Sequence, residues 1–193
     1  MAATESTMLG LGTPAPDFGL PDAVSGRTIR LSDFAPKQAL LVMFLCPHCP
    51  YVKHIQQGLA ALLAEYRNQP LGVMAISSND VAQFPEDAPD GLRQSAVDLG
   101  FDFPYCYDES QEVAKAYQAA CTPDFFLFDR DRHLVYRGQF DSSRPKNDVP
   151  VTGSDLRAAL DAVLSGHPVS TEQRPSIGCN IKWKPGNEPE YYR

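Results

Sequence analysis

Runs of apolar residues along the first half of the chain predict alternating strands and helices. Residues 39–45 and 71–77 are nearly continuous apolar runs, which are typical of central strands covered on both faces. Between them, apolar side chains recur at helical spacing and predict a helix over about 47–67. A strand, a helix and a second strand in this order indicate an α/β fold.

The second half adds an antiparallel pair to this pattern. Further helices are predicted over 92–99, 110–119 and 154–164, and further strands over 14–22, 28–31, 105–107, 124–128 and 134–140. The last two strands flank a short polar turn, as in a hairpin. We therefore predict an α/β thioredoxin-type sandwich with a mixed central sheet flanked by helices and a strand extension near the N-terminus.

The 193 residues suit one domain, which we assign to residues 10–185. Residues 1–9 are predicted to be a flexible N-terminus. Residues 166–193 hold four prolines and little periodicity, so we expect an irregular tail that wraps the surface. Within this tail, Ile177, Ile181 and Trp183 surround Cys179. Burying each large apolar side chain contributes about 1.5 to 3 kcal/mol, so we predict that the tail docks on the body of the fold.

Composition and charge indicate a packed globular protein and argue against nucleic-acid binding. Hydrophobic residues make up 43% of the chain, which indicates a packed globule. A net charge of −7 argues against a nucleic-acid-binding surface. The longest apolar run, residues 39–45, is too short to cross a bilayer. Residues 1–8 lack the pattern of a secretory signal, so we expect a cytoplasmic protein, with a leader missing from this sequence as the alternative.

The cysteines supply the candidate chemistry. There are five, an odd number that fits poorly with a disulfide framework: Cys46, Cys49, Cys106, Cys121 and Cys179. Cys46 and Cys49 fall where a buried strand ends and a helix is predicted to begin. Cα atoms at this spacing on a helix lie about 5 to 6 Å apart, within disulfide range. The positive end of the helix dipole stabilises a thiolate, and we expect the helix start to expose Cys46 as the nucleophile and to shield Cys49.

His48, between the two cysteines, can offer a positive charge or a hydrogen bond to the Cys46 thiolate. Such a partner stabilises the reduced form and makes the disulfide more oxidising. The alternative is that Cys46 and Cys49 are half of a zinc site. A zinc site usually needs a second pair of ligands, and Cys121 and Cys179 are distant from each other and unpaired. We therefore favour redox chemistry, with no metal and no cofactor.

Several motifs carry a resemblance to a known family. The order of Cys46-Pro-His-Cys49 between a strand and a helix, with Thr122-Pro123 before a later strand, resembles the thioredoxin superfamily. The opening Gly12-Thr-Pro-Ala-Pro-Asp-Phe18 and Leu31-Ser-Asp-Phe34 resemble the peroxiredoxin and alkyl hydroperoxide reductase (thiol-specific antioxidant) branch. Cys49-Pro-Tyr-Val52 and Cys121-Thr-Pro-Asp-Phe-Phe-Leu-Phe-Asp129 resemble a peroxiredoxin-like subgroup that carries a C-x-x-C motif. The resemblance covers about residues 10–185.

The resemblance implies that Pro123 is a cis-proline facing the cysteine pair. It also exposes a departure, because typical peroxiredoxins place a threonine where this chain has Met43. They use an arginine to polarise the peroxide as well, and the candidates Arg137 and Arg144 match no family motif. Without an oriented hydroxyl a peroxide lacks a hydrogen-bonding partner, so we expect slow peroxidase chemistry.

We predict a thiol-disulfide oxidoreductase that uses Cys46, Cys49, His48 and Pro123, with Thr122, Cys121 and Cys179 as accessory residues. Its partners are protein or small-molecule disulfides, peroxides as a further substrate class, and a thiol reductant system. Two alternatives remain: a thiol-dependent peroxidase, and a redox sensor or binding module without turnover. Cys121 is more simply explained as a buried apolar side chain, and Cys179 as either a resolving thiol or a passive packing residue.

Overall fold

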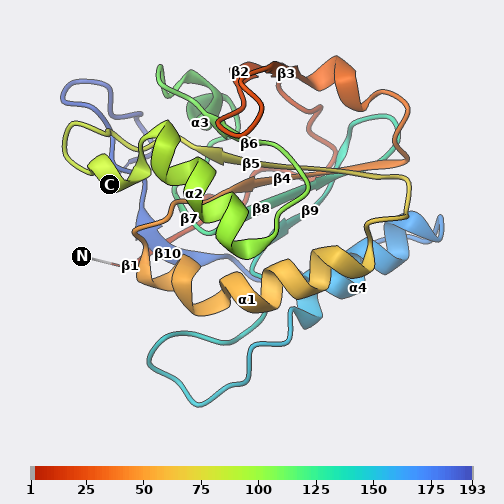
Figure 1. The fold of residues 1–193 in the computed structure, drawn as a ribbon. Helices are drawn as coiled ribbons and strands as arrows, with labels where there is room; N and C mark the ends of the chain where they lie inside the picture. Colours follow the sequence, from red (N-terminus) through yellow and green to blue (C-terminus); the bar gives the residue numbers. More distant parts are fainter. Residues whose placement is uncertain (1–2, 193) are drawn as a thin grey trace.

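A five-stranded mixed sheet forms the centre of the computed structural model, which describes residues 3–192 (Figure 1). The strand order is β6 (Tyr105–Tyr107), β5 (Leu71–Ser77), β4 (Ala39–Phe44), β8 (Asp124–Phe128) and β9 (Leu134–Gly138). β4, β5 and β6 run parallel, while β8 and β9 join antiparallel. The mixed sheet predicted from the sequence is therefore confirmed.

Helices and loops cover both faces of this sheet. Every side chain of β4 is buried, and alternate positions point to opposite faces, as a strand requires. Leu41 and Met43 pack on the face covered by α1 (Pro50–Glu65), α2 (Pro89–Leu99) and α4 (Ser154–Leu164) (Figure 1). Leu40 and Val42 pack on the face covered by α3 (Glu112–Ala116) and residues of the N-terminal hairpin, β2 (Gly19–Pro21) and β3 (Thr28–Arg30).

The two ends of the chain meet in a second, three-stranded sheet. Its order is β1 (Ala3–Glu5), β10 (Ile177–Asn180) and β7 (Cys121–Thr122), all antiparallel. Within the predicted flexible N-terminus and irregular tail, residues 3–5 and 177–180 thus form short strands. Residues 1 and 2 lie outside the described part. Docking of the tail is confirmed, because Trp183 is only 6% exposed and Ile181 only 1%.

Several element boundaries differ from those predicted. α1 begins at Pro50, with Cys49 as its N-cap, rather than near Pro47. Both prolines suit a first turn, where backbone N–H groups have no partner inside the helix, so the sequence does not choose between them. α2 begins earlier than predicted, at Pro89, and ends at Gly100 in the left-handed conformation. The loop before it holds a 3-10 turn, η2 (Pro85–Asp87); another, η1 (Leu31–Phe34), follows β3.

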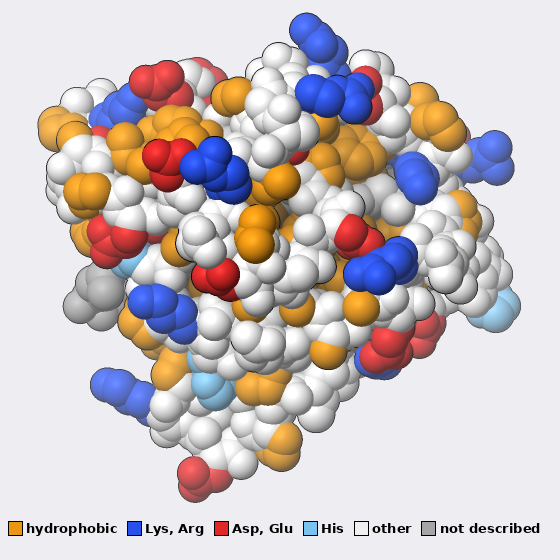
Figure 2. Space-filling view, viewed as in Figure 1, with side chains coloured by type: hydrophobic (Ala, Val, Ile, Leu, Met, Phe, Trp, Pro, Cys, Tyr) orange, Lys and Arg blue, Asp and Glu red, His pale blue; other side chains and the backbone are white. Residues whose placement is uncertain are grey.

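Acidic and basic side chains are interspersed over the face in Figure 2, with hydrophobic groups scattered between them. Within residues 3–192, no helix combines the length and apolar character that a bilayer crossing requires.

Candidate active site

The cysteine pair lies at the carboxyl end of β4, beside the start of β8. The antiparallel register pairs Phe44 with Asp124, which brings the segments on either side of that pair together. Cys46 follows β4 by two residues, and Pro123 directly precedes Asp124. The Thr122–Pro123 peptide bond is cis, as the resemblance predicts. The fold therefore brings Cys46, Cys49 and Thr122 into one cluster.

Thr122 makes a polar contact with each cysteine. Its Oγ1 lies 3.2 Å from Cys46 Sγ, and its carbonyl oxygen accepts a hydrogen bond from Cys49 Sγ at 3.2 Å. Both cysteines are free thiols with 0% exposure. The expectation that the helix start exposes Cys46 is therefore wrong: the helix starts three residues later than predicted, so Cys46 lies in the buried turn before it.

The electrostatics of the two thiols differ. Burial raises the pKa of Cys46, and the hydrogen bond to Cys49 and the Asp87 charge add to the rise. The pKa of Cys49 is lowered, because the Cys179 thiol, the Cys46 thiol and the Val52 backbone N–H all direct hydrogen bonds to its sulfur. Negative charge is therefore favoured on Cys49 rather than on Cys46, first by the Cys179 thiol and then by the Cys46 thiol, with a contribution from the Val52 N–H in the first turn of α1.

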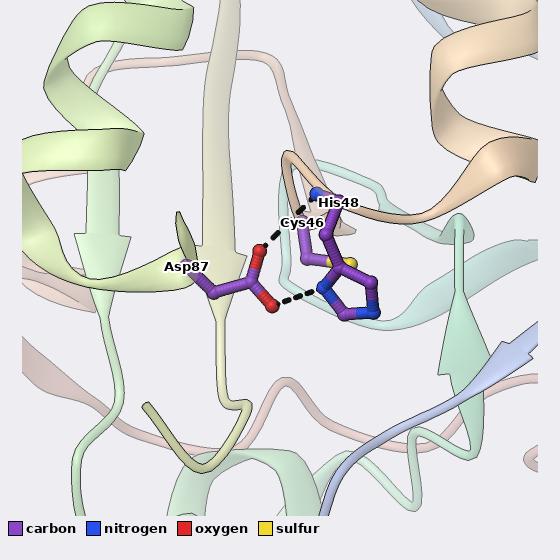
Figure 3. Close-up of side chains that lie close together, drawn as sticks. All are labelled: Cys46, His48 and Asp87. Carbon is purple, nitrogen blue, oxygen red and sulfur yellow. Dashed lines mark hydrogen bonds and ion pairs between the residues drawn. The ribbon is translucent and has the colours of Figure 1, made fainter. Parts of the chain in front are cut away.

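His48 contacts a carboxylate rather than a thiolate. Its Nδ1 lies 2.5 Å from Asp87 Oδ2, and its backbone N–H donates to Asp87 Oδ1 at 3.2 Å (Figure 3). Asn79 Nδ2 donates to the same Oδ2 at 2.8 Å. Among the described residues no hydrogen bond joins His48 to Cys46, so the predicted direct bond is absent. His48 bonds to the Asp87 carboxylate instead.

Asp87 is the residue that sequence analysis missed. It lies in η2, in a polar loop that contains two prolines, where a solvated side chain is the ordinary expectation. Its side chain is nevertheless fully buried. Ligand-type atoms of Cys46, His48 and Asp87 lie within 4.8 Å of one another. The sequence holds no signal for this contact, because only the tertiary path of the loop creates it.

An aromatic stack adjoins the same histidine. The His48 ring is stacked on Phe84, with ring centroids 4.5 Å apart, and Lys182 Nζ lies 5.6 Å from the Phe84 centroid. The Lys182 backbone also holds Asn79, by donating to its Oδ1 at 2.8 Å. The C-terminal tail thus supports the side chains that fix Asp87 and His48.

The geometry of Cys46, His48 and Asp87 does not fit a tetrahedral metal site. In such a site, metal–nitrogen and metal–oxygen bonds of about 2.0 to 2.2 Å separate adjacent donor atoms by about 3.3 Å. Here His48 Nδ1 and Asp87 Oδ2 are 2.5 Å apart and already hydrogen-bonded to each other. Their lone pairs and protons face one another rather than a common centre.

Among the described residues, the other side chains considered from the sequence make no hydrogen bond to the two sulfurs. Met43 is fully buried in β4. Arg137 donates to Leu9 and Gln173, and Arg144 to Gln139, Asp141 and Ser143. Cys121 is buried, and its thiol donates to the Pro123 carbonyl at 3.6 Å rather than to the pair.

Comparison with known proteins gives the family. Residues 11–137 match the model of the AhpC/TSA family. Thiol-disulfide oxidoreductase ResA of Geobacillus kaustophilus (strain HTA426) is 28% identical over 128 residues, 66% of this chain and 68% of that protein. An uncharacterized conserved protein from Geobacillus kaustophilus is 54% identical, with a TM-score of 0.94 over 96% of this chain and 98% of that chain.

A more distant structure shares only the fold. The thioredoxin domain of thiol-disulfide oxidoreductase BVU-2223 from Bacteroides vulgatus is 17% identical, with a TM-score of 0.56 over 67% of this chain and 88% of that chain. With its central mixed sheet, its cis-proline and the matched family model, the chain belongs to the AhpC/TSA family and has a thioredoxin-like fold.

Proposed function

We propose that this protein is a thiol-disulfide oxidoreductase that cycles Cys46 and Cys49 between dithiol and disulfide. One observation carries the proposal: both sulfurs converge on Thr122, each 3.2 Å from one of its oxygens, directly before a cis-proline. The opposite pKa shifts of the two thiols support it, because each thiol is a cause of the shift of the other.

In the proposed reaction, Cys46 attacks a substrate disulfide. Its proton passes to Cys49, the neighbouring sulfur on which negative charge is favoured, because the pKa of Cys49 is lowered and that of Cys46 is raised. The Cys46 thiolate forms a mixed disulfide with one substrate sulfur and the other substrate sulfur leaves as a thiolate, which takes a proton. Cys49 then gives up its proton, attacks Cys46 and releases the second substrate thiol. The substrate gains two electrons and the pair becomes a disulfide, which an external thiol reductant reduces again.

Position favours Cys46 as the thiol that meets the substrate. Cys49 is enclosed by Cys46, Thr122, Cys179 and the first turn of α1. Cys46 adjoins His48, whose side chain retains 7% exposure and stacks on Phe84. Because both cysteines have 0% exposure, a substrate disulfide reaches Cys46 only when the residues that cover it move.

Turnover of a protein disulfide tests this proposal and separates it from a redox sensor. We expect the reduced protein to catalyse reduction of insulin disulfides by dithiothreitol, followed by turbidity. Cys46→Ala and Cys49→Ala should abolish catalysis, whereas Cys106→Ala, which removes a buried thiol on β6, should retain it. A wild-type rate equal to that of Cys46→Ala would reject enzymatic disulfide exchange. A single oxidation without turnover would favour a sensor.

One contact favours a thiol peroxidase as the second candidate. The hydroxyl that Met43 cannot supply comes instead from Thr122, whose Oγ1 lies 3.2 Å from Cys46 Sγ. The guanidinium groups of Arg137 and Arg144 bond elsewhere, so that hydroxyl would act without a cation beside it. Peroxide chemistry through Cys46 therefore has one of the two expected polar partners.

A further inference from the structure

Cys179 brings a third sulfur to the cysteine pair from the far end of the sequence. In the antiparallel pairing of β10 with β7, Cys179 lies directly opposite Thr122. Side chains of directly opposed residues project from the same face, with Cβ atoms about 4.5 to 5.5 Å apart. The Thr122 hydroxyl on this face lies 3.2 Å from Cys46 Sγ, and Cys179 belongs to the same buried cluster as Cys46 and Cys49, so the Cys179 side chain faces the pair.

The residue before Cys179 fixes how closely β10 approaches. A Cβ atom at Gly178 would lie 2.0 Å from the Thr122 carbonyl oxygen and 3.1 Å from the Pro123 nitrogen. Only a glycine allows this separation, so the backbone of β10 lies directly against the segment that holds the pair. Cys179 itself is 2% exposed and belongs to the same buried cluster as Cys46 and Cys49.

Backbone N–H groups in the first turn of α1 favour negative charge on two of the three sulfurs. The Val52 N–H lowers the pKa of Cys49, and the Tyr51 N–H favours the thiolate of Cys179. The thiols of Cys179 and Cys46 also lower the pKa of Cys49. Cys49 is therefore the sulfur of the three that is influenced by both of the others.

We propose that Cys179 is a third redox thiol, which takes over the Cys46–Cys49 disulfide by attacking the Cys49 sulfur. This inference rests on the proposed function, because that function supplies the disulfide. In the exchange, the S–S bond between Cys46 and Cys49 breaks and one between Cys49 and Cys179 forms. Cys179 loses its proton and Cys46 leaves as a thiolate that takes one up. No electrons are gained or lost overall, so the step needs no further oxidant.

Oxidation of the pair makes this exchange easier. In the dithiol state the hydrogen bond to Cys49 is the largest cause that raises the pKa of Cys179, followed by burial and the Cys49 charge. Both the acceptor and the charge disappear when Cys49 enters a disulfide. Lys182 and the Tyr51 N–H, which favour the thiolate, remain. Cys179 therefore becomes a better nucleophile at the moment when its target exists.

The other two cysteines do not share this geometry. Cys121 lies opposite Asn180, so its side chain projects from the other face of β7, away from Thr122's side chain. Cys106 lies in the cluster on the opposite face of the central sheet from Cys49 and Cys179. The exchange is therefore specific to Cys179, and its product ties β10 covalently to the start of α1 while freeing Cys46.

Disulfide mapping tests this proposal. The purified Cys46→Ser protein is oxidised with diamide, alkylated with iodoacetamide, digested and analysed by mass spectrometry. We expect a Cys49–Cys179 disulfide as the main product, lost in Cys46→Ser/Cys179→Ser and retained in the matched control Cys46→Ser/Cys121→Ser. In oxidised wild-type protein, a fraction of molecules should carry alkylated Cys46 together with a Cys49–Cys179 disulfide. The wild-type measurement does not depend on the folding of any variant.

The outcomes separate this inference from the proposed function. Free Cys179 in oxidised wild-type protein and in Cys46→Ser, or scrambled disulfides with Cys106 or Cys121, would overturn the inference. A Cys46–Cys49 disulfide found in that same wild-type sample would leave the proposed function intact. Conversely, a Cys49–Cys179 disulfide that forms from the first moments of oxidation, with no Cys46–Cys49 disulfide preceding it at any time point in wild-type protein, would overturn both the proposed pair and the exchange that depends on it.

Discussion

Gly178→Ala tests whether the C-terminal strand holds Thr122 against the cysteine pair. A Cβ atom at this position would lie 2.0 Å from the Thr122 carbonyl oxygen and 2.6 Å from its carbonyl carbon. Ordinary van der Waals contact needs about 3.5 Å, so β10 and β7 must separate by roughly 1.5 Å. That separation breaks the pairing of β10 with β7 and withdraws Thr122 or Cys179 from the sulfurs.

The loss of stability in Gly178→Ala can be judged from these contacts. Overpacking a filled interior typically costs about 1 to 3 kcal/mol, and each lost backbone hydrogen bond about 1 kcal/mol more. We expect the free energy of unfolding to fall by about 3 kcal/mol, which for a domain of this size lowers Tm by roughly 6 to 12 °C. Insulin reduction should fall as well, because Thr122 no longer orients Cys46 and Cys49.

Urea unfolding, calorimetry and the insulin assay measure these effects. Gly19→Ala is the matched control, since it also adds a methyl group to a strand glycine but meets no atom closer than 3.9 Å. We expect it to change stability by less than about 1 kcal/mol. Equal stability and equal activity of the two variants would refute the argument that β10 clamps Thr122 in place.

Three further predictions concern the His48–Asp87 pair, the C-terminal tail and the reaction with peroxide. His48→Ala should make the reduction potential of the pair more negative, because Asp87 loses its hydrogen-bonding partner and its charge then disfavours a Cys46 thiolate more strongly. Asp87→Asn removes that charge, so it should make the potential less negative. It should also move the alkylation of Cys46 to lower pH. Redox titration against glutathione checks both signs, and shifts of the same sign would reject the reasoning. Trp183 emission should move to longer wavelength in urea, since its side chain is buried; identical native and denatured spectra would show an undocked tail. Hydrogen peroxide should oxidise the protein slowly in stopped flow, and a rate matching a dedicated peroxidase would favour the second candidate function.

Elements defined by local patterns were predictable from the sequence. β5 matches its predicted bounds, because a continuous apolar run between polar loops leaves little freedom in where a buried strand begins and ends. The end of α2 at Gly100 was equally clear, since a glycine with φ of 65° terminates a helix without steric cost. Cys46 and Cys49 were recognisable because the strand before them and the helix after them are both strongly patterned.

Features decided by long-range pairing were not predictable in the same way. β10 holds a glycine, a cysteine and an asparagine in only four residues, and it forms a strand because β1 and β7 pair with it. The position of Asp87 depends on the path of a polar loop toward His48, which no local pattern records. The start of α1 at Pro50 rather than Pro47 is likewise decided by contacts of the turn that holds His48.

Trapping of a mixed disulfide tests the central claim most directly. Reduced Cys49→Ser protein is mixed with insulin, quenched with acid and mapped by mass spectrometry, beside Cys46→Ser/Cys179→Ser protein, in which no neighbouring thiol can resolve an adduct on Cys49. If Cys46 attacks substrate and Cys49 resolves the intermediate, a stable insulin adduct accumulates on Cys46 in the first protein and none forms on Cys49 in the second. An adduct found on Cys49 in the second protein, with Cys46 unmodified in the first, would contradict the account.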